Sequence, residues 1–451
     1  MRGARSVKVA LFLAISTASV WLSAGQAPGG AGVRLFDGAR LIMGDGRVIE
    51  SAAFIVENNR FTRVGRKGEV ALPPGAVRVD LSGKTVMPAI IDPHNHIGYT
   101  NQKTGVSSKD NYTRATIVDH LQRYAYYGIG TAMSMGLDRW DVNPELPYQL
   151  RNEAIPNAAR FITVGRGIAA TPMAGPTASY RLGVPYGAQS EAEGRKDVDE
   201  LIARKVPIIK IWVDDRLGTV PKIQPNVYRA IIDEAHKNNT RVVAHIFALE
   251  DGKDLLKAGV DGFAHGVRDK DIDGEYMAIV TQHPNVWVEP NLPEQPEGPE
   301  SLDWLADTIP AAQLKRMKDQ LASRTPAQTK ALADAFGIQC RNLKKIREAG
   351  VRIAFATDAG VDMAWTTHTE LSDMVQCGLT PAEAIIAATR TAAEVVKVND
   401  IGTIETGKSA DFIVLDANPL DAIANTRKIN RVFLRGQEVD RAALRASFVA
   451  P

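Results

Sequence analysis

Four of the eight histidines in this sequence, together with one aspartate, stand at the ends of short apolar segments. His94 and His96 are separated by one residue, so in a strand their imidazoles point to the same side. His245, His265 and Asp358 each end a later apolar segment. Each residue alone is compatible with a structural histidine or, for Asp358, with a helix cap. Together they form a ligand set for zinc or a similar divalent ion, and we expect a metal site.

Lys210 lies inside another apolar segment, residues 206–213. A lysine held in an apolar strand that faces a barrel interior must lose its charge, find a partner or be modified. Carboxylation of the amine by CO₂ would make it an anionic oxygen ligand that can bridge two cations. The alternative is a side chain that reaches solvent beyond the strand end. Because five other candidate metal ligands are present, we favour the interpretation of Lys210 as a bridging ligand.

Apolar segments and helical patterns alternate eight times through the middle of the chain. Near-continuous apolar strands, each followed by a helix, are typical of a parallel sheet that is covered on both faces. We therefore expect an α/β fold with a (β/α)₈ TIM-type barrel, and the metal-site residues then stand at its C-terminal face. The expected strands are residues 85–91, 130–135, 160–164, 206–213, 241–245, 262–265, 286–289 and 351–357. The expected helices are residues 113–127, 148–153, 191–204, 226–238, 250–258, 273–282, 328–349 and 368–377.

Short strand-like segments separated by turns occupy both ends of the chain. Neither end alone could bury a core, so we expect the two terminal β pieces to pack together. The expected division is a signal peptide (1–27), the N-terminal β piece (28–84), the barrel (85–398) and the C-terminal β piece (399–451). Three long connections, residues 98–112, 165–189 and 290–325, follow strands one, three and seven and lie at the active-site face of such a barrel.

The N-terminus has the features of a secretory signal peptide. Arg2, Arg5 and Lys8 precede an apolar run at residues 9–22, and small residues follow. The run is shorter than the roughly 20 residues of a membrane span, although an uncleaved anchor is the alternative. We expect a periplasmic or secreted protein whose mature chain begins near residue 25 or 28.

The charge balance indicates which kinds of molecule the protein binds, and the two cysteines raise the question of a disulfide. The chain has 54 Lys and Arg against 52 Asp and Glu, with no basic block. We therefore expect a small-molecule substrate and no nucleic-acid or membrane partner after signal cleavage; an assembly of identical subunits is compatible with this composition. Cys340 and Cys377 lie in helix-like sequence, and although export permits a disulfide, we expect two buried thiols.

Several motifs resemble those of the amidohydrolase superfamily, within it the imidazolonepropionase-related, prolidase-like branch. The resemblance extends over about residues 33–440. The motifs are MPAIIDPHNH at 87–96, IKI at 209–211, FATDAG at 355–360, HTEL at 368–371, GLTP at 378–381 and the segment 402–415. Ala89 departs from the glycine usual in the family, and alanine fits there if the backbone φ is negative. Imidazolonepropionase is a one-metal enzyme without a bridging lysine, so Lys210 points to the dipeptidase-like, binuclear members.

The resemblance implies a barrel with a small flanking β-sandwich, formed by the terminal pieces 28–84 and 399–451. It also implies two divalent ions, which we expect to be zinc. It implies that His94, His96 and Asp358 ligate one ion, that His245 and His265 ligate the other, and that carboxylated Lys210 bridges them. The ions would activate a water that attacks the substrate. Asp358 would hold that water and pass its proton to the leaving group.

The expected activity is hydrolysis of an amide bond in a small molecule such as a dipeptide or an N-acyl amino acid. The alternative is a carbamate, a lactone or another ester; a deaminase or a non-catalytic metal- or solute-binding protein has less support. Within the strand-three connection, a substrate carboxylate could be bound by Arg166, Tyr180, Arg181 and Tyr186. His368 resembles a family histidine near the site and is the next candidate base after Asp358.

Overall fold

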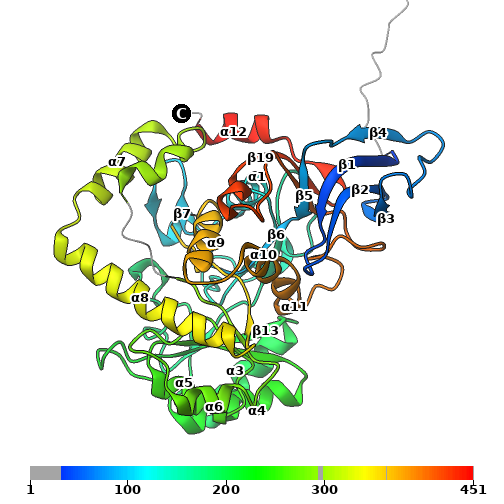
Figure 1. Ribbon diagram of the computed structural model, residues 1–451. Coiled ribbons are helices and arrows are strands. Elements are labelled where there is room, and N and C mark those ends of the chain that lie inside the picture. The colour runs from blue at the N-terminus through cyan, green and yellow to red at the C-terminus, as the bar shows by residue number, and fades with distance from the viewer. Residues whose placement is uncertain (1–31, 293–297, 362, 450–451) are drawn as a thin grey trace, which may run out of the picture.

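The computed structural model describes residues 32–292, 298–361 and 363–449 (Figure 1). The segment expected to be a signal peptide lies outside these residues. Within them, no helix has the length and apolar character that a membrane span requires.

A barrel of parallel strands forms the centre of the molecule. Its strands are β6 (Ile90–Asn95), β9 (Ile129–Ser134), β10 (Arg160–Thr163), β13 (Ile208–Val213), β14 (Arg241–Ile246), β15 (Gly262–Phe263), β16 (Trp287–Val288) and β17 (Arg352–Ile353). The predicted strand three is split: β10 pairs with β9, and the following β11 (Ile168–Ala169) pairs with β13. A parallel bridge between Asn95 and Ala359 joins the first strand to the segment after the last, which closes the barrel.

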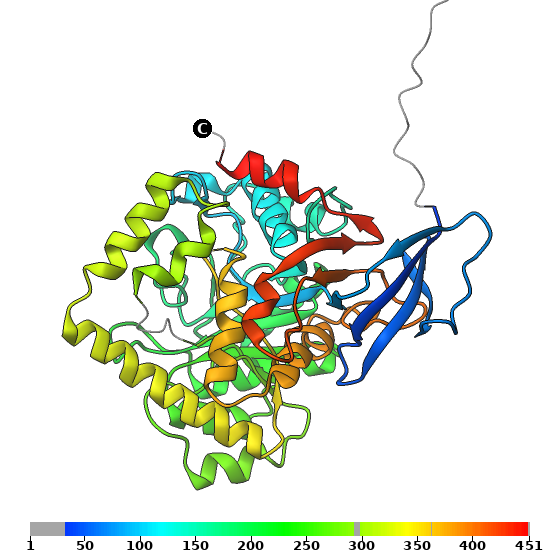
Figure 2. The same ribbon diagram turned by 45° about the horizontal axis from the view of Figure 1, so that its top comes forward.

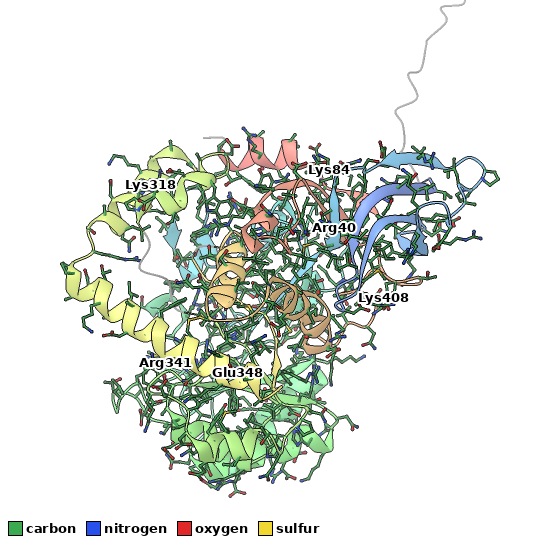
Figure 3. All side chains as sticks on the ribbon, in the orientation of Figure 1. Arg40, Lys84, Lys318, Arg341, Glu348 and Lys408 are labelled. Atoms are coloured by element: carbon green, nitrogen blue, oxygen red, sulfur yellow. A yellow bond between two sulfur atoms is a disulfide. The ribbon has the colours of Figure 1, made fainter. Side chains whose placement is uncertain are left out.

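Helices follow the strands and cover the outside of the barrel (Figures 1 and 2). They are α1 (Arg114–Tyr126), α2 (Leu146–Leu150), α3 (Glu191–Ala203), α4 (Pro225–Lys237), α5 (Leu249–Lys257), α6 (Gly274–Val280), α8 (Pro326–Glu348), α9 (Thr366–Gln376), α10 (Pro381–Ile386) and α11 (Ala392–Val395). Ser190, Thr325 and Thr380 begin three of them with complete capping boxes. On α8, the exposed Arg341 and Glu348 lie on the outer surface (Figure 3). The (β/α)₈ architecture predicted from the alternating segments is confirmed.

Apolar side chains from the barrel strands and from residues that directly follow them fill the barrel interior beneath the polar end. One cluster contains the buried Ile91, Met133, Ile208, Val243, Ala264, Trp287 and Ala354, and the partly buried Ile162 packs against it. Gly262 makes room for the indole of Trp287, because a Cβ built at Gly262 would lie 2.2 Å from the ring. The barrel is therefore a packed core with its chemistry confined to one end.

The two ends of the chain share one eight-stranded sheet beside the barrel. Its strands are β1 (Arg34–Ile42), β2 (Val48–Glu57), β3 (Arg60–Arg66), β4 (Val77–Asp80), β5 (Thr85–Pro88), β18 (Phe412–Leu415), β19 (Ile429–Leu434) and β20 (Gln437–Glu438). Its core includes five buried phenylalanines, Phe36, Phe54, Phe61, Phe412 and Phe433. β5 pairs with β1 and β18, so the apolar run expected to be barrel strand one divides at Ala89 between sheet and barrel.

The long connections contain structure that the sequence pattern did not reveal. The connection after strand one holds a small hairpin, β7 (Thr100–Asn101) and β8 (Val106–Ser107). The connection after strand seven contains α7 (Ala311–Ala322), which was expected to be loop. Short strands β11 and β12 (Tyr186–Gly187) pair within the strand-three connection. C-terminal helix α12 (Arg441–Val449) lies beside α1.

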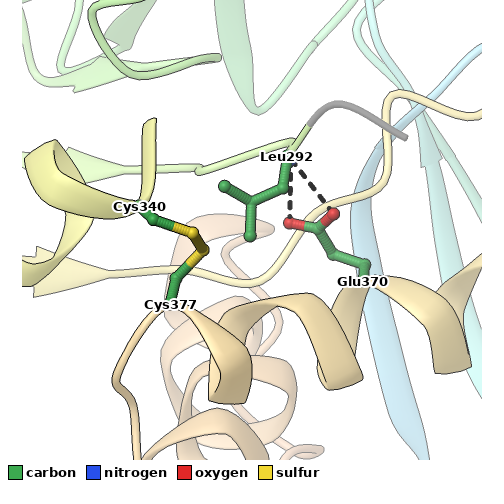
Figure 4. Close-up of a disulfide and its surroundings, with 4 residues drawn as sticks. All are labelled: Leu292, Cys340, Glu370 and Cys377. Carbon is green, nitrogen blue, oxygen red and sulfur yellow. Dashed lines mark hydrogen bonds between the residues drawn. A yellow bond between two sulfur atoms is a disulfide. The ribbon is translucent and has the colours of Figure 1, made fainter. Parts of the chain in front are cut away.

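The expectation of two free thiols is wrong: Cys340 and Cys377 form a disulfide (Figure 4). Cys340 lies in α8 and Cys377 ends α9, and their Cα atoms are 4.5 Å apart. Both residues lie in helical sequence as expected, but the packing of the two helices brings the sulfur atoms together. Beside the disulfide, both carboxylate oxygens of Glu370 accept hydrogen bonds from the Leu292 backbone, at 3.2 and 3.1 Å.

Candidate active site

The end of strand one and the segment after strand eight are hydrogen-bonded to each other. The backbone N–H of Asp358 donates to the carbonyl of His94 at 2.8 Å, and that of His96 donates to Ala359 at 2.7 Å. Asp358 has a φ of 53°, in the left-handed region that few non-glycine residues occupy. Strained backbone of this kind often marks a functional residue, and here it turns the carboxylate toward the histidines.

Three imidazoles converge on the Asp358 carboxylate. Its oxygens lie 3.3 Å from His94 Nε2, 2.9 Å from His96 Nε2 and 3.7 Å from His265 Nε2. The ring of His245 is 4.7 Å from that of His265, centroid to centroid. Ligand atoms of His94, His265 and Asp358 all lie within 4.8 Å of one another, a spacing that suits one metal ion.

The Lys210 amine points into the same place and is almost fully buried. Its Nζ has no hydrogen-bond partner among the described residues. Burial lowers the pKa of Lys210 to about 8, although the charges of Glu289 and Asp358 oppose the shift. An unpaired, buried amine with a lowered pKa is the form that reacts with CO₂, so the residue fits the role of a modified ligand.

Two carboxylates that the sequence analysis missed support the histidines from behind. Glu289 Oε2 lies 3.1 Å from His94 Nδ1, and its other oxygen accepts a hydrogen bond from the Trp287 indole at 3.2 Å. Asp214 Oδ2 lies 3.2 Å from His245 Nε2. Both carboxylates directly follow an apolar strand, which was a signal that the sequence offered. Carboxylates in this position orient metal-binding imidazoles.

Burial keeps the imidazoles in the neutral form that binds metal. It lowers the pKa of His96 and His245 to about 4 and that of His94 and His265 well below the usual value. Burial opposes ionisation of Asp358, yet the surrounding imidazoles hold the pKa of its carboxyl well below the usual range. The cluster therefore consists of neutral nitrogen donors around one carboxylate.

The cluster opens into a small cavity of about 90 Å³. Arg181 contributes a guanidinium to its wall, and the Nε and one terminal nitrogen of this group are buried without a hydrogen-bond partner among the residues that the structure describes. Gly360 leaves the room for this guanidinium, because a Cβ there would lie 1.9 Å from Arg181 Nη2. The other lining residues are His94, His96, Leu137, Gly175, Pro176, Thr177, Lys210, Trp212, His245, His265 and Asp358.

Of the five residues expected to contact substrate, the structure brings only Arg181 to the cavity wall. Tyr180 packs against Tyr99, with ring centroids 5.7 Å apart. Arg166 and Tyr186 line a separate groove of about 390 Å³, where the guanidinium lies 3.8 Å from the Tyr186 ring centroid.

His368 does not reach the cavity. Its two ring nitrogens lie 3.0 Å from the Thr426 hydroxyl and 3.0 Å from the Tyr127 carbonyl oxygen, and the side chain is fully buried. These contacts attach α9 to α1 and to the C-terminal segment. The motif that contains His368 did not reveal this, because α9 begins close to the site but directs the imidazole away from it.

Comparison with known proteins agrees with this arrangement. A model of the amidohydrolase family matches residues 85–439. Imidazolonepropionase of Deinococcus radiodurans is 26% identical over 417 residues, which cover 88% of this chain and 94% of that enzyme. Ochratoxinase of Aspergillus niger is 26% identical over 418 residues, which cover 85% of this chain and 81% of that enzyme.

Among solved structures, a Xaa-Pro dipeptidase with methionine bound in its active site has the same fold. The TM-score is 0.71 at 22% identity, and the match covers 90% of this chain and 99% of the dipeptidase. The amidohydrolase family generally binds divalent metals, and the His–Asp cluster described above is a possible metal site. This chain therefore belongs to the amidohydrolase family, on its imidazolonepropionase-related and prolidase-like branch, and is a hydrolase that acts on carbon–nitrogen bonds.

Proposed function

We propose that this protein hydrolyses an amide bond in a small molecule that carries a carboxylate, such as a dipeptide or an N-acyl amino acid. The observation that carries the proposal is Arg181 at the wall of the cavity that holds the metal-site residues: two of its guanidinium nitrogens are buried and have no hydrogen-bond partner in the described part of the chain. Its guanidinium contacts the Tyr99 and Tyr180 rings, but rings do not replace hydrogen-bond acceptors, and a substrate carboxylate would supply them. The Xaa-Pro dipeptidase is by name a dipeptide hydrolase, which makes dipeptides the first class to test.

The residues fit two divalent ions, which we take to be zinc. His94, His96 and Asp358 would hold one ion, His245 and His265 the other, and a carboxylated Lys210 would supply the bridging oxygens. The neutral imidazoles and the unpaired Lys210 amine support this assignment. When bound, such ions act as Lewis acids toward water and toward the substrate carbonyl.

Asp358 would serve as the proton carrier. Its carboxylate is 37% exposed and faces the cavity among three imidazoles. One oxygen would accept a proton from the attacking water and then deliver it to the leaving nitrogen. Arg181 would hold the substrate carboxylate and so fix the scissile bond beside Asp358. The apolar side chains of Trp212 and Leu137 at the cavity wall would limit the entry of water.

Two alternatives remain. In the first, the substrate is a carbamate, a lactone or another ester, and the same activated water attacks it. A non-catalytic metal- or solute-binding protein would need the cluster but not a proton carrier. The family relationship favours hydrolysis of a carbon–nitrogen bond over both alternatives, and the unpaired Arg181 nitrogens favour a substrate that carries a carboxylate.

We also propose that the protein is exported and acts outside the cytoplasm. The charged, then apolar N-terminal segment supports export. The Cys340–Cys377 disulfide gives independent support, because disulfides persist in oxidising compartments. N-terminal sequencing of the protein from its native host tests the proposal, and a cytosolic species that retains Met1 would contradict it.

The experiment that tests the activity combines metal analysis with a substrate panel. We expect about two zinc equivalents per chain and turnover of dipeptides or N-acyl amino acids. Arg181→Met should raise KM for these substrates but leave metal content unchanged. A metal-loaded protein that hydrolyses none of the amides would overturn the proposal, and turnover of esters alone would transfer it to the ester alternative. One tightly bound equivalent with full activity would remove the two-metal assignment.

A further inference from the structure

Strand β13 and the turn that follows it supply side chains to two different parts of the site. Lys210 and Trp212 line the cavity from the strand. Asp214 follows, with one oxygen 3.2 Å from the His245 imidazole. Its other oxygen accepts a hydrogen bond from the Arg216 backbone N–H at 2.8 Å. One carboxylate therefore holds both a metal-site histidine and the turn after strand four.

The turn has an unusual backbone. Arg216, Leu217 and Gly218 have φ values of 49°, 57° and 82°. Successive left-handed residues are rare when they are not glycine, so the surrounding contacts must hold this turn. The Asp215 side chain accepts from the Gly218 backbone at 3.2 Å, and Lys222 lies 3.5 Å from Asp215. The result is a fixed direction for the Arg216 side chain.

Arg216 is directed at the connection after strand three. One terminal nitrogen lies within hydrogen-bond distance of three consecutive carbonyl oxygens, those of Ala174, Gly175 and Pro176, and shares its two hydrogens among them. Gly175 and Pro176 are themselves cavity-lining residues, and Arg181 follows in the same connection. A guanidinium that contacts three consecutive carbonyls in this way can hold a segment that has little regular structure of its own.

The same connection lies close against Trp212. A Cβ built at Gly167 would lie 2.1 Å from the indole, and one built at Gly175 would lie 3.2 Å from it. The glycines allow the backbone to pack on the ring, but they also leave the connection conformationally free. Two arginines from outside the connection hold it: Arg139 donates to the Tyr180 carbonyl beside Arg181, and Arg216 contacts the cavity-lining Gly175 and Pro176.

We propose that Arg216 is a positioning residue for substrate recognition. Through the turn set by Asp214, it holds the segment 174–176 and thereby the wall of the cavity and the placement of Arg181. This inference rests on the proposed function insofar as Arg181 recognises a carboxylate. The new element of the proposal is that the single turn after β13 connects His245, a metal-site histidine, with the substrate-binding wall.

The test compares Arg216→Met and Arg216→Lys in the metal-loaded protein. Methionine keeps much of the apolar stem but removes the donors, so KM for a carboxylate-bearing amide should rise roughly 10- to 100-fold. We expect kcat to change less than about 3-fold and metal content to stay at the wild-type value. Lysine, whose N–H donors all lie on one nitrogen, should restore part of the wild-type KM. Arg195→Met, which removes a guanidinium that pairs with Asp233 and Glu234 on the outer surface, is the matched control.

Hydrogen exchange of residues 165–189 gives a readout that does not need turnover. Exchange of the backbone amides of Ala174, Gly175 and Thr177, which lie in or next to the segment 174–176, should become faster in Arg216→Met and should not change in Arg195→Met. Selectivity adds a second measure: the preference for a carboxylate-bearing amide over its uncharged analogue should fall in Arg216→Met.

The outcomes separate the two proposals. Unchanged exchange and unchanged KM in Arg216→Met would overturn the positioning role. Equal loss of kcat/KM on charged and uncharged amides, with metal lost as well, would also overturn it, because that pattern indicates a general structural defect. If the wild type shows no preference for carboxylates but Arg216→Met still loosens residues 174–176, the carboxylate proposal fails and the role of Arg216 in holding the wall stands.

Discussion

At the scale of single residues, the site contains groups with similar positions and different tasks. Asp358 lies among the imidazoles of His94, His96 and His265, where it can both ligate and carry a proton. His94 and His245 are suited to ligation, since Glu289 and Asp214 each lie within hydrogen-bond distance of one ring nitrogen and leave the other free to bind metal. Substitution separates the two tasks.

Asp358→Asn should keep much of the metal and lose most of the rate. The amide oxygen can still coordinate weakly, but it cannot take up a proton at neutral pH. We expect a fall in kcat of roughly 10²- to 10⁴-fold, the usual contribution of general acid–base catalysis. Metal analysis and steady-state kinetics of the same sample provide the measurement.

His94→Ala is the matched comparison and should lose metal and activity together, because the buried strand end offers no replacement donor. Near-native turnover of Asp358→Asn on the best substrate would show that another group is the base. His368, the alternative raised by the sequence, lies away from the cavity and would not be that group.

His368 should matter for stability instead of rate. His368→Gln removes the contact with Thr426 or Tyr127, and we expect a loss of about 1–3 kcal/mol in unfolding free energy. We expect kcat/KM to stay within about 3-fold of the wild type. Chemical denaturation and kinetics on the same preparation check both parts.

The pH dependence has a definite sign. Burial lowers the pKa of His368 to about 3 in the folded state, against about 6.5 when unfolded. Below pH 6.5, His368 is protonated in the unfolded chain but stays neutral in the folded chain. The free energy of unfolding therefore decreases as the pH falls below 6.5. At pH 5 the loss is about 2 kcal/mol. The stability advantage of wild type over His368→Gln should therefore shrink between pH 7.5 and pH 5; a constant gap would contradict the assigned protonation.

At the scale of elements, the connections after the strands determine what the barrel can recognise. The strand-three connection brings Arg181 to the cavity, while Arg166 holds the far side by donating to the carbonyls of Val184 and Pro185 at 2.7 and 3.1 Å. The strand-seven connection ends in α8, and the disulfide joins α8 to the end of α9 (Figure 4). Helices α8 and α9 contribute no side chain to the cavity, but the disulfide between them stabilises the structure that surrounds it.

The disulfide should add stability without changing the chemistry. It spans 37 residues of sequence, and closing a loop of that size in the unfolded chain is worth about 3–4 kcal/mol in the chain-entropy model. The double variant Cys340→Ala, Cys377→Ala should unfold roughly 3–6 °C below the oxidised wild type, with kcat within about 2-fold. Calorimetry with and without a reductant checks this.

The reduced wild type is the internal control, because reductant should bring it close to the double variant and leave the variant itself unchanged. Two free thiols in the native, oxidised protein, detected by thiol titration under denaturing conditions, would contradict the disulfide.

At the scale of the whole molecule, the β-sheet domain and the barrel depend on each other. β5 pairs with β18 from the other end of the chain, and the next residues enter the barrel as β6. Strand one of the barrel, which carries His94, is thus continuous with the centre of the flanking sheet. Folding of the terminal segments and assembly of the metal site are expected to be linked.

Metal removal should lower the stability of the entire protein. Ligands that bind only the folded state stabilise it by mass action, about 4 kcal/mol at a free concentration 1,000 times the dissociation constant. A chelator should therefore lower the unfolding temperature, and added zinc should restore it. His245→Ala should show a smaller response, since one donor is already absent. An unfolding temperature that does not change on chelation would contradict a resident metal.

The barrel, the terminal β segments and the main site residues could be predicted from local pattern alone. Apolar strands followed by helices leave few alternatives to a parallel barrel, and histidines placed at the strand ends indicate which face carries the chemistry. His94 and His96 are predicted to point together because side chains alternate along a strand. These features depend on neighbours in sequence, so the sequence by itself determined them.

Other features depended on contacts between segments that are distant in sequence. The Cys340–Cys377 disulfide, the support of His94 by Glu289, and the placement of Arg181 rather than Tyr180 or Arg166 at the cavity all belong to this group. His368 shows the same limit: it follows the site closely in sequence, but the packing of α9 turns it to Tyr127 and Thr426. Local periodicity places a residue on an element, but only the packing of elements decides which side chains meet, and for this protein that decision belongs to the tertiary structure.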